Sequence, residues 1–165
     1  MKNILFAIVM LTIFSNCNKT NINKCCSGAP QAVYIDSSYI AMPDIFTPNG
    51  DGINDHLIVF SKNIVSIELT ITKRFGKVVF SSTDMYSYWD GKFNGKDQRE
   101  KSYSYTLEAT TTSGNTISLS GDIAVIRDNC AKGNFQDCFF GTQFNNLTNS
   151  FDRNLPSNEI INVCN

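Results

Sequence analysis

The stretch VSIELTIT, residues 65–72, alternates apolar and polar side chains at every position. Because successive side chains of a strand point to opposite faces of the sheet, Val65, Ile67, Leu69 and Ile71 are expected on one face. The serine, glutamate and threonines between them are expected on the other. Such alternation is typical of an antiparallel sheet with one buried and one solvated face.

The same signal recurs on both sides of this stretch. The turn residues SGN at 113–115 separate two alternating runs, as in a hairpin, and no segment of residues 33–127 has a convincing helical period. Several short strands divided by turns predict an all-β fold, an antiparallel β-sandwich. The further strand candidates are YSYTLEAT (103–110), TISLSG (116–121), DIAVIR (122–127) and the short apolar runs LIVF (57–60) and KVVF (77–80), which we expect to be buried.

The N-terminus has the pattern of a bacterial lipoprotein signal. Lys2 precedes an unbroken apolar run of eleven residues, Ile4–Phe14, and Cys17 follows three residues later. The run is shorter than the about 20 residues that cross a bilayer, but it suits the apolar core of a secretory signal. We expect residues 1–16 to be removed and Cys17 to carry the acyl chains (palmitate) of an outer-membrane anchor. The alternative is an ordinary cleaved signal.

The rest of the chain divides into three parts. Residues 17–32 are polar and small, and we interpret them as a tether with a cysteine pair. Residues 33–127 carry the strand signals and form the predicted sandwich. Residues 128–165 are rich in asparagine, cysteine and phenylalanine, and their aromatic content argues against a free disordered tail. We expect an irregular C-terminal extension that packs on the sandwich or on a partner, held by disulfides.

Export makes disulfides possible. If Cys17 carries lipid, five cysteines remain, so one is unpaired or bonded to another chain. Bridges would tie the two ends of the mature chain together or link two cysteines within the tail. Zinc is the weaker interpretation, because no C-x-x-C pair occurs and the chain has a single histidine. The disulfide candidates are Cys25, Cys26, Cys130, Cys138 and Cys164.

The segment FTPNGDGIND, residues 46–55, is dense in glycine and in oxygen-bearing side chains. Neither reading frame matches an EF-hand loop, because apolar Ile53 falls where a ligand is needed. Two interpretations stay open: a calcium site of another kind, and a tight double turn held by side-chain-to-backbone hydrogen bonds. The candidate calcium ligands are Asn49, Asp51, Asn54 and Asp55, with Asp90 if the fold brings it near.

Other features weigh against several classes of function. A formal charge of −1 predicts no basic surface for nucleic acid. Hydrolase, phosphate-loop and dinucleotide signatures are absent, so we expect neither an enzyme nor a small-molecule substrate. Trp89, the only tryptophan, is expected to anchor the core, and His56 is expected at the surface where a strand starts.

Five motifs occur in one order: IFTPNGDGIND, IELTITKRFGKVVF, WDGKFNGK, YSYTLEATTTSGN and GDIAVIR. Together they resemble the gliding-motility-associated C-terminal domain, the type B sorting domain of type IX secretion cargo, over about residues 42–127. The resemblance implies an immunoglobulin-like β-sandwich. In that family the module ends its protein, whereas residues 128–165 follow it here.

These observations predict a non-enzymatic outer-membrane lipoprotein that binds an outer-membrane protein as an accessory subunit of an envelope complex. The alternative is type IX secretion cargo or a surface adhesin, stabilised by calcium if the loop binds it. The residues after Cys17 lack an acidic cluster, which favours the periplasmic face, while the resemblance favours the surface. We rank the cell surface first.

Overall fold

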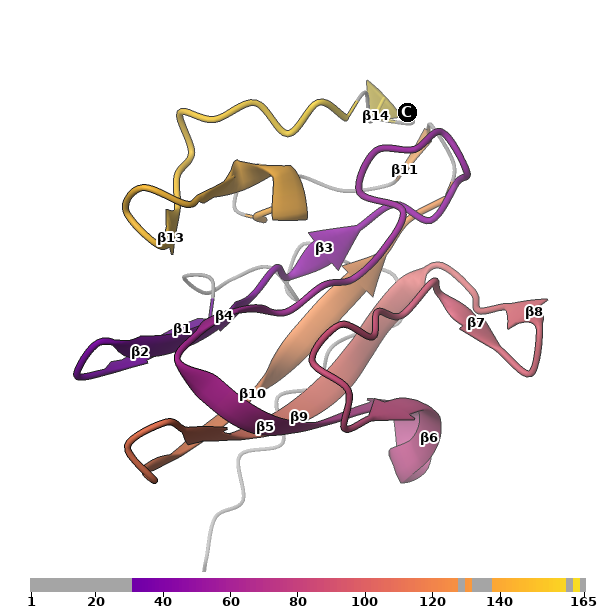
Figure 1. The fold of residues 1–165 in the computed structure, drawn as a ribbon. Coiled ribbons are helices and arrows are strands. Elements are labelled where there is room, and N and C mark those ends of the chain that lie inside the picture. Colours follow the sequence, from indigo (N-terminus) through magenta and orange to yellow (C-terminus); the bar gives the residue numbers. More distant parts are fainter. Residues whose placement is uncertain (1–30, 128–129, 132–137, 160–161, 164–165) are drawn as a thin grey trace, which may run out of the picture.

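The computed structural model describes residues 31–127, 130–131, 138–159 and 162–163. They form two facing sheets with a segment folded over one of them (Figure 1). Strands β1, β2 and β4 make an antiparallel three-stranded sheet, and β3, β10, β9, β5 and β6 make a five-stranded sheet in which only β3 pairs parallel. Their bounds are β1 Gln31–Ile35, β2 Ser38–Met42, β3 Ile45–Phe46, β4 Phe60–Lys62, β5 Ile64–Lys73, β6 Lys77–Ser82, β9 Lys101–Thr111 and β10 Thr116–Val125.

Six short strands and two helical turns complete the described fold. The strand pairs are β7 (Lys92–Phe93) with β8 (Lys96–Asp97), β12 (Phe144–Asn145) with β13 (Ser150–Phe151), and β11 (Cys130–Ala131) with β14 (Asn162–Val163). Single 3-10 turns cover Arg74–Gly76 and Gly141–Gln143. No α-helix occurs in the described residues, and no helix among them is long and apolar enough to cross a membrane. The predicted all-β sandwich is confirmed.

The core lies between the two sheets. From the three-stranded sheet it takes Ile40 and Met42, and from the five-stranded sheet the apolar positions of β5, β9 and β10. Thr111 and Asn115 close the predicted hairpin between β9 and β10. The expected inward side chains that are buried are Ile67, Leu69, Ile71, Tyr103, Tyr105, Leu107, Ala109, Ile117, Leu119, Ile123 and Val125.

Val65 departs from the predicted alternation. Its side chain is 57% exposed, and Ile64 is buried instead. The cause is a β-bulge: Ile64 pairs with Thr111 and Ser66 with Thr110, so Val65 is an extra residue in its strand. An extra residue changes which face the side chains before it point to, and apolar alternation alone does not locate it.

The two short apolar runs are less buried than expected. In residues 57–60, Leu57 is buried but Ile58 is exposed, and only Phe60 belongs to a strand. In residues 77–80, Val79 is buried and Val78 exposed, because β6 is an edge strand with one solvated face. Neither run is therefore a fully covered strand: residues 77–80 lie on an edge strand, and residues 57–59 lie outside the named strands.

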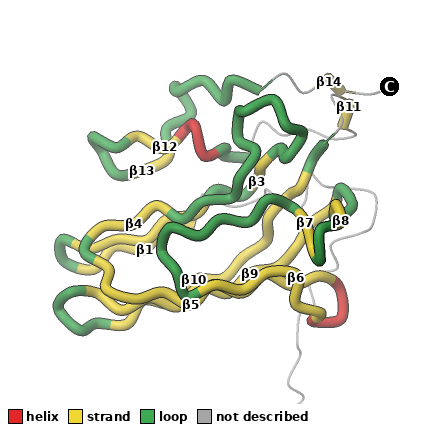
Figure 2. Tube along the Cα trace, turned by 45° about the vertical axis from the view of Figure 1, so that its right-hand side comes forward, coloured by secondary structure: helices red, strands yellow, loops and turns green. Residues whose placement is uncertain are grey.

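The described part of the extension, residues 138–159, packs back on the sandwich. Figure 2 shows it lying over the layer that contains β1 and β4, on the side away from the five-stranded sheet. Phe144 packs with Tyr39 and Ala41 on the outer face of that layer, and Phe60 and Phe151 pack against them. All five residues of β2 are consequently buried, since its two faces are both covered.

Candidate functional site

The loop of residues 47–55 is held as a tight double turn by its own side chains. The Asp55 carboxylate accepts hydrogen bonds from the N–H groups of Gly50 and Gly52, both at 2.7 Å. Both glycines have φ near +90°, in the region that side chains rarely adopt, which explains why glycine recurs at alternate positions. Burial acts to raise the pKa of Asp55, but these backbone hydrogen bonds prevail and lower it, so the carboxylate is ionised at neutral pH.

Two further side chains cap the same turn. Asn49 accepts a hydrogen bond from the Asp51 N–H at 3.0 Å, and Asp51 accepts one from the Ile53 N–H at 2.8 Å. These side-chain-to-backbone bonds are those that the double-turn interpretation requires. The sequence motif is thus a structural turn in this fold.

Asp90, the candidate calcium ligand outside this loop, also has a hydrogen-bond role in a turn. Asp90 accepts a hydrogen bond from the Lys92 N–H at 2.9 Å, and its second oxygen lies 3.8 Å from the Lys92 ammonium. Within the described ranges, no group of three or more His, Cys, Asp or Glu side chains is placed to hold a metal ion. Calcium binding by Asn49, Asp51, Asn54, Asp55 and Asp90 stays a prediction from the sequence.

Several of the sequence motifs meet at one end of the sandwich, through contacts of Trp89 and Arg127. Trp89 is fully buried against Phe46 and Tyr103, and its indole N–H donates to the Lys92 carbonyl at 2.9 Å. This confirms its predicted role as a core anchor. The Arg127 guanidinium donates to carbonyls of three loops, those of Pro48, Gly91 and Gln98.

Asp44 joins the extension to the start of β3. This side chain is 7% exposed, and it accepts a hydrogen bond from the Phe139 N–H at 2.6 Å, while the Asp44 N–H donates to the Phe139 carbonyl. Burial raises the pKa of the Asp44 carboxyl to about 6, although the Phe139 hydrogen bond and nearby Arg153 act to lower it. Asp44 was not among the site residues predicted from the sequence; the available signal was a lone acid in the apolar segment IAMPDIF.

Asn54 makes the second contact between loop and extension. Its Oδ1 accepts a hydrogen bond from the Thr142 N–H at 3.1 Å, and its Nδ2 donates to the Ser157 carbonyl at 3.0 Å and to Glu159 at 3.1 Å. The Thr47 hydroxyl also donates to Glu159. Burial raises the pKa of Glu159, opposed by these two side-chain hydrogen bonds. Asn54 was predicted as a metal ligand, and in the structure it fastens the extension.

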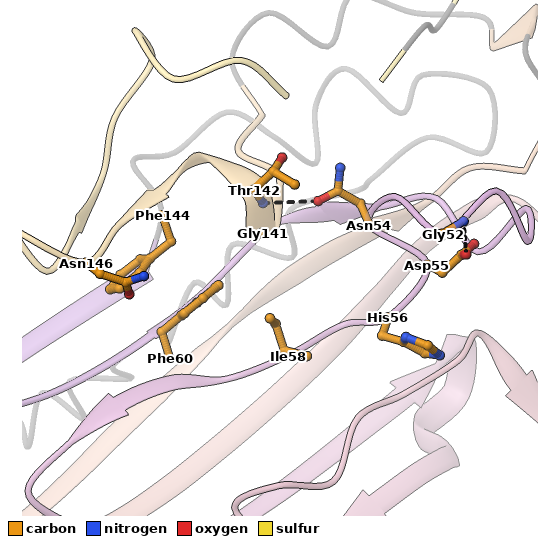
Figure 3. A pocket seen from close by; sticks show the side chains of 10 residues that line it. All are labelled: Gly52, Asn54, Asp55, His56, Ile58, Phe60, Gly141, Thr142, Phe144 and Asn146. Atoms are coloured by element: carbon orange, nitrogen blue, oxygen red, sulfur yellow. Dashed lines mark hydrogen bonds between the residues drawn. The ribbon is translucent and has the colours of Figure 1, made fainter. Parts of the chain in front are cut away.

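An open pocket of about 410 Å³ lies along the junction between loop and extension (Figure 3). Ile58, Phe60 and Phe144 project into its middle, and Asn54 and Thr142 close one side. The other lining residues are Gly52, Asp55, His56, Gly141 and Asn146. Since six of the lining residues belong to the sandwich and four to the extension, neither segment makes the pocket alone.

His56 is exposed at the end of this pocket, as the sequence predicted. Its ring lies 4.0 Å, centroid to centroid, from the ring of Tyr88. His56 lines the pocket together with Asp55, and its pair with Tyr88 forms an aromatic rim there. Tyr86, two residues away on the same loop, is also exposed.

The lipidation and disulfide predictions fall mostly outside the described residues. Cys17, Cys25, Cys26 and Cys164 lie outside them, and of Cys130 only the backbone is described, in β11. Cys138 is buried in a cluster with Ile45, Ala124, Ile126 and Phe140, and it is not a free thiol. The lipid on Cys17 and the pairing of the cysteines stay predictions.

Comparison with known families identifies the sandwich. The family model CHU_C, type IX secretion signal domain, matches residues 40–124, just over half of the 165 residues. The chain belongs to this family. The match runs from β2 into β10, so it includes the FTPNG loop and Trp89, and it leaves out β1 and the extension. No curated protein matches the chain.

Membership in the type IX secretion signal domain family agrees with the resemblance carried by the five motifs. It makes this chain a type IX secretion-related protein of the cell surface or the exterior. The pocket lies where this domain meets the extension, with Gly52 to Phe60 inside the matched range and Gly141 to Asn146 outside it.

Proposed function

We propose that this protein is a lipid-anchored binding subunit of an outer-membrane protein complex at the cell surface. The observation that carries the proposal is the docking of residues 138–159 on the type IX secretion signal domain through Phe144, Asp44 and Asn54. The domain is therefore part of a larger folded unit, whereas a cleavable secretion signal would have few contacts with its surroundings.

The anchor is proposed at Cys17. The support is the eleven-residue apolar run that ends three residues before it. A lipid anchor confines the sandwich to a thin layer at the membrane, which raises its effective concentration near a membrane partner and lets a modest interface suffice. Family membership favours the outer face of that membrane.

A binding role is proposed in preference to catalysis. What supports it is the position of the carboxyl groups with shifted pKa values: Asp44, Asp55 and Glu159 each accept hydrogen bonds that hold two segments or a turn together. Shifted carboxyls that belong to such structural networks are explained without a reaction.

Purification from the native membrane tests the proposal. The tagged chain, expressed in its own host and extracted in mild detergent, is expected to bring down one outer-membrane protein in stoichiometric amount. Mass spectrometry is expected to find lipid on Cys17 and intact residues after Arg127. Recovery of the chain alone, in the medium or cut after Arg127, would contradict the proposal.

A pair of substitutions isolates the anchor. Cys17→Ser is expected to release the protein from the membrane fraction, because the acylated sulfur is lost. Cys26→Ser, nine residues further along the same tether, is expected to leave membrane attachment unchanged. Equal membrane attachment of both variants would refute the anchor at Cys17.

A second candidate function is secreted cargo or a surface adhesin, with calcium as a stabilising ion. The family match favours it, since the matched domain is a secretion signal. Secreted cargo predicts recovery of the chain alone, in the medium or cut after Arg127, which the same purification detects.

A further inference from the structure

The pocket between loop and extension has an apolar centre. The rings of Phe60 and Phe144 are stacked, with centroids 4.1 Å apart and planes 13° from parallel. The side chain of Ile58 is 38% exposed beside them, and Figure 3 shows it pointing into the space below Thr142. A concave site with an apolar centre and a few polar groups at its rim is the usual form of a binding pocket.

One end of the pocket is negatively charged. Asp55 lines it, and each of its two oxygens accepts one backbone N–H, which leaves lone pairs for a further donor. Asp51 and Asp55 both lie close enough to Glu159 to act on its charge: burial raises the pKa of Glu159, and these two carboxylates raise it further. None of the ten lining residues is a lysine or an arginine.

We propose that this pocket binds a basic side chain on an apolar stem, an arginine in particular, presented by the protein partner. The inference rests on the proposed function, because it assigns the contact through which that partner is held. The arginine stem lies over Phe60, Phe144 and Ile58, and its guanidinium reaches Asp55 and the His56–Tyr88 rim.

Arginine fits this lining better than lysine does. Its guanidinium is planar, stacks on aromatic rings and offers a fork of donors to a carboxylate, whereas the lysine ammonium is a compact and strongly hydrated charge. The His56 ring, which lines the pocket together with Asp55 and contacts Tyr88, supplies the stacking surface. An acidic ligand would meet the Asp55 carboxylate in the lining, with Glu159 and Asp51 as further negative charges nearby, and is disfavoured.

Two capped dipeptides test the pocket on the full chain. Acetyl-Leu-Arg-amide carries the charge, and acetyl-Leu-citrulline-amide is its uncharged isostere. His56 is the only histidine in the chain, so its imidazole NMR signals report on the pocket rim without overlap from another histidine. The arginine peptide is expected to shift the signals of His56 and of the Ile58 methyl groups saturably, and to bind at least fivefold more tightly than the citrulline peptide.

Salt provides an independent check on the charge. The preference for arginine over citrulline is expected to shrink as ionic strength rises, because exposed charges are screened. No shift at His56 and Ile58 with millimolar arginine peptide, or equal affinity for the two peptides, would overturn the inference.

Two matched substitutions locate the binding site. Ile58→Ala shortens an exposed apolar side chain inside the pocket, and Val78→Ala shortens one on β6, outside the lining. Ile58→Ala is expected to weaken binding of the arginine peptide severalfold, and Val78→Ala to leave it unchanged. Equal effects of the two would overturn the inference.

Asp55→Asn is expected to abolish the preference for arginine, and a thermal melt checks that its turn stays folded.

The purification from outer membranes separates the two proposals. If the unaltered chain recovers a partner and the Ile58→Ala variant recovers it equally well, the pocket inference fails and the binding-subunit proposal stands. If the unaltered chain recovers no partner, the binding-subunit proposal fails, and the inferred contact with a partner fails with it. If the unaltered chain recovers the partner and the Ile58→Ala variant does not, both proposals are supported.

Discussion

The two sheets of the sandwich differ in what covers their outer faces. The middle of the five-stranded sheet presents exposed Glu68, Thr106, Glu108 and Ser118 to solvent, and its strands alternate between polar and apolar residues. The three-stranded sheet has apolar residues on both faces, and its outer face is sealed by the extension. An apolar outer face needs a cover, and here the cover comes from the segment that follows the family domain.

Removing the extension is expected to have the largest effect on stability. A chain that ends at residue 137 lacks the buried rings of Phe139, Phe140 and Phe144, each worth about 1.5–3 kcal/mol of burial. Their sum is comparable with the whole stability of an ordinary domain, about 5–15 kcal/mol. The truncated chain is expected to lose its cooperative thermal transition. A melt identical to that of the full chain would show that the extension adds no stability.

A pair of substitutions within the extension sharpens the comparison. Phe144 is 6% exposed and Leu147, three residues later, is 94% exposed. Phe144→Ala is expected to lower the free energy of unfolding by about 3–5 kcal/mol, because it leaves a cavity over the three-stranded sheet. Leu147→Ala is expected to change it by less than about 0.5 kcal/mol. Denaturant unfolding measures both, and similar values for the two variants would contradict the docking.

Asp44 makes the attachment of the extension depend on pH. Its pKa is about 6 in the folded chain and 3.8 as a reference, so the folded state binds more protons between these values. Its contribution to stability is therefore complete below pH 4 and lost as the pH rises through about 6, a change of about 3 kcal/mol.

The Asp44→Asn variant isolates this contribution. The free energy of unfolding of the unaltered chain, minus that of the variant, is measured between pH 4 and 7. This difference is expected to fall as the pH rises. A difference that is flat over this range would mean that the Asp44 carboxyl is not buried as described.

Asn54 should have a smaller effect. Asn54→Asp keeps an acceptor for Thr142 but loses the donor to Ser157 and Glu159, and it adds a charge next to Glu159. The expected loss is about 1–3 kcal/mol in chemical denaturation. Asn94→Asp is the control, because Asn94 is exposed and has a similar positive φ in the β7–β8 turn. Equal losses at the two positions would show that the Asn54 side chain does not hold the extension on the loop.

Calcium removal is expected to have the smallest effect. The Asp55 and Asp51 carboxylates already accept backbone N–H groups, so the turn has its internal partners without a cation. A chelator is expected to leave the melting temperature unchanged. A sharp fall in the melting temperature would support calcium binding by the loop.

The strand pattern predicted β5, β9 and β10 because each of these strands has one solvated face. It failed at Val65, where a bulge inserts a residue, and bulges have no signature in apolar alternation. The burial of Trp89 was also predictable, since a large apolar side chain between turn residues is best placed in a core.

The contacts of the extension were beyond prediction from the chain. Phe139 meets Asp44 across 95 positions of sequence, and Thr142 meets Asn54 across 88. The aromatic content of the extension indicated that it packs on a surface, but not which surface. The FTPNGDGIND segment left turn and metal site open, because the same oxygens serve either purpose until their hydrogen-bond partners are known.

Hydrogen exchange on the full chain tests the central claim that the extension and the sandwich are one folded unit. The N–H groups of Phe139 and Thr142 donate to side chains of the sandwich, and those of β2 lie beneath the extension. These amides are expected to exchange as slowly as those of β9, because one cooperative opening exposes all of them. Fast exchange across residues 138–159 and β2, with β9 still protected, would show that the extension opens on its own and would contradict the account.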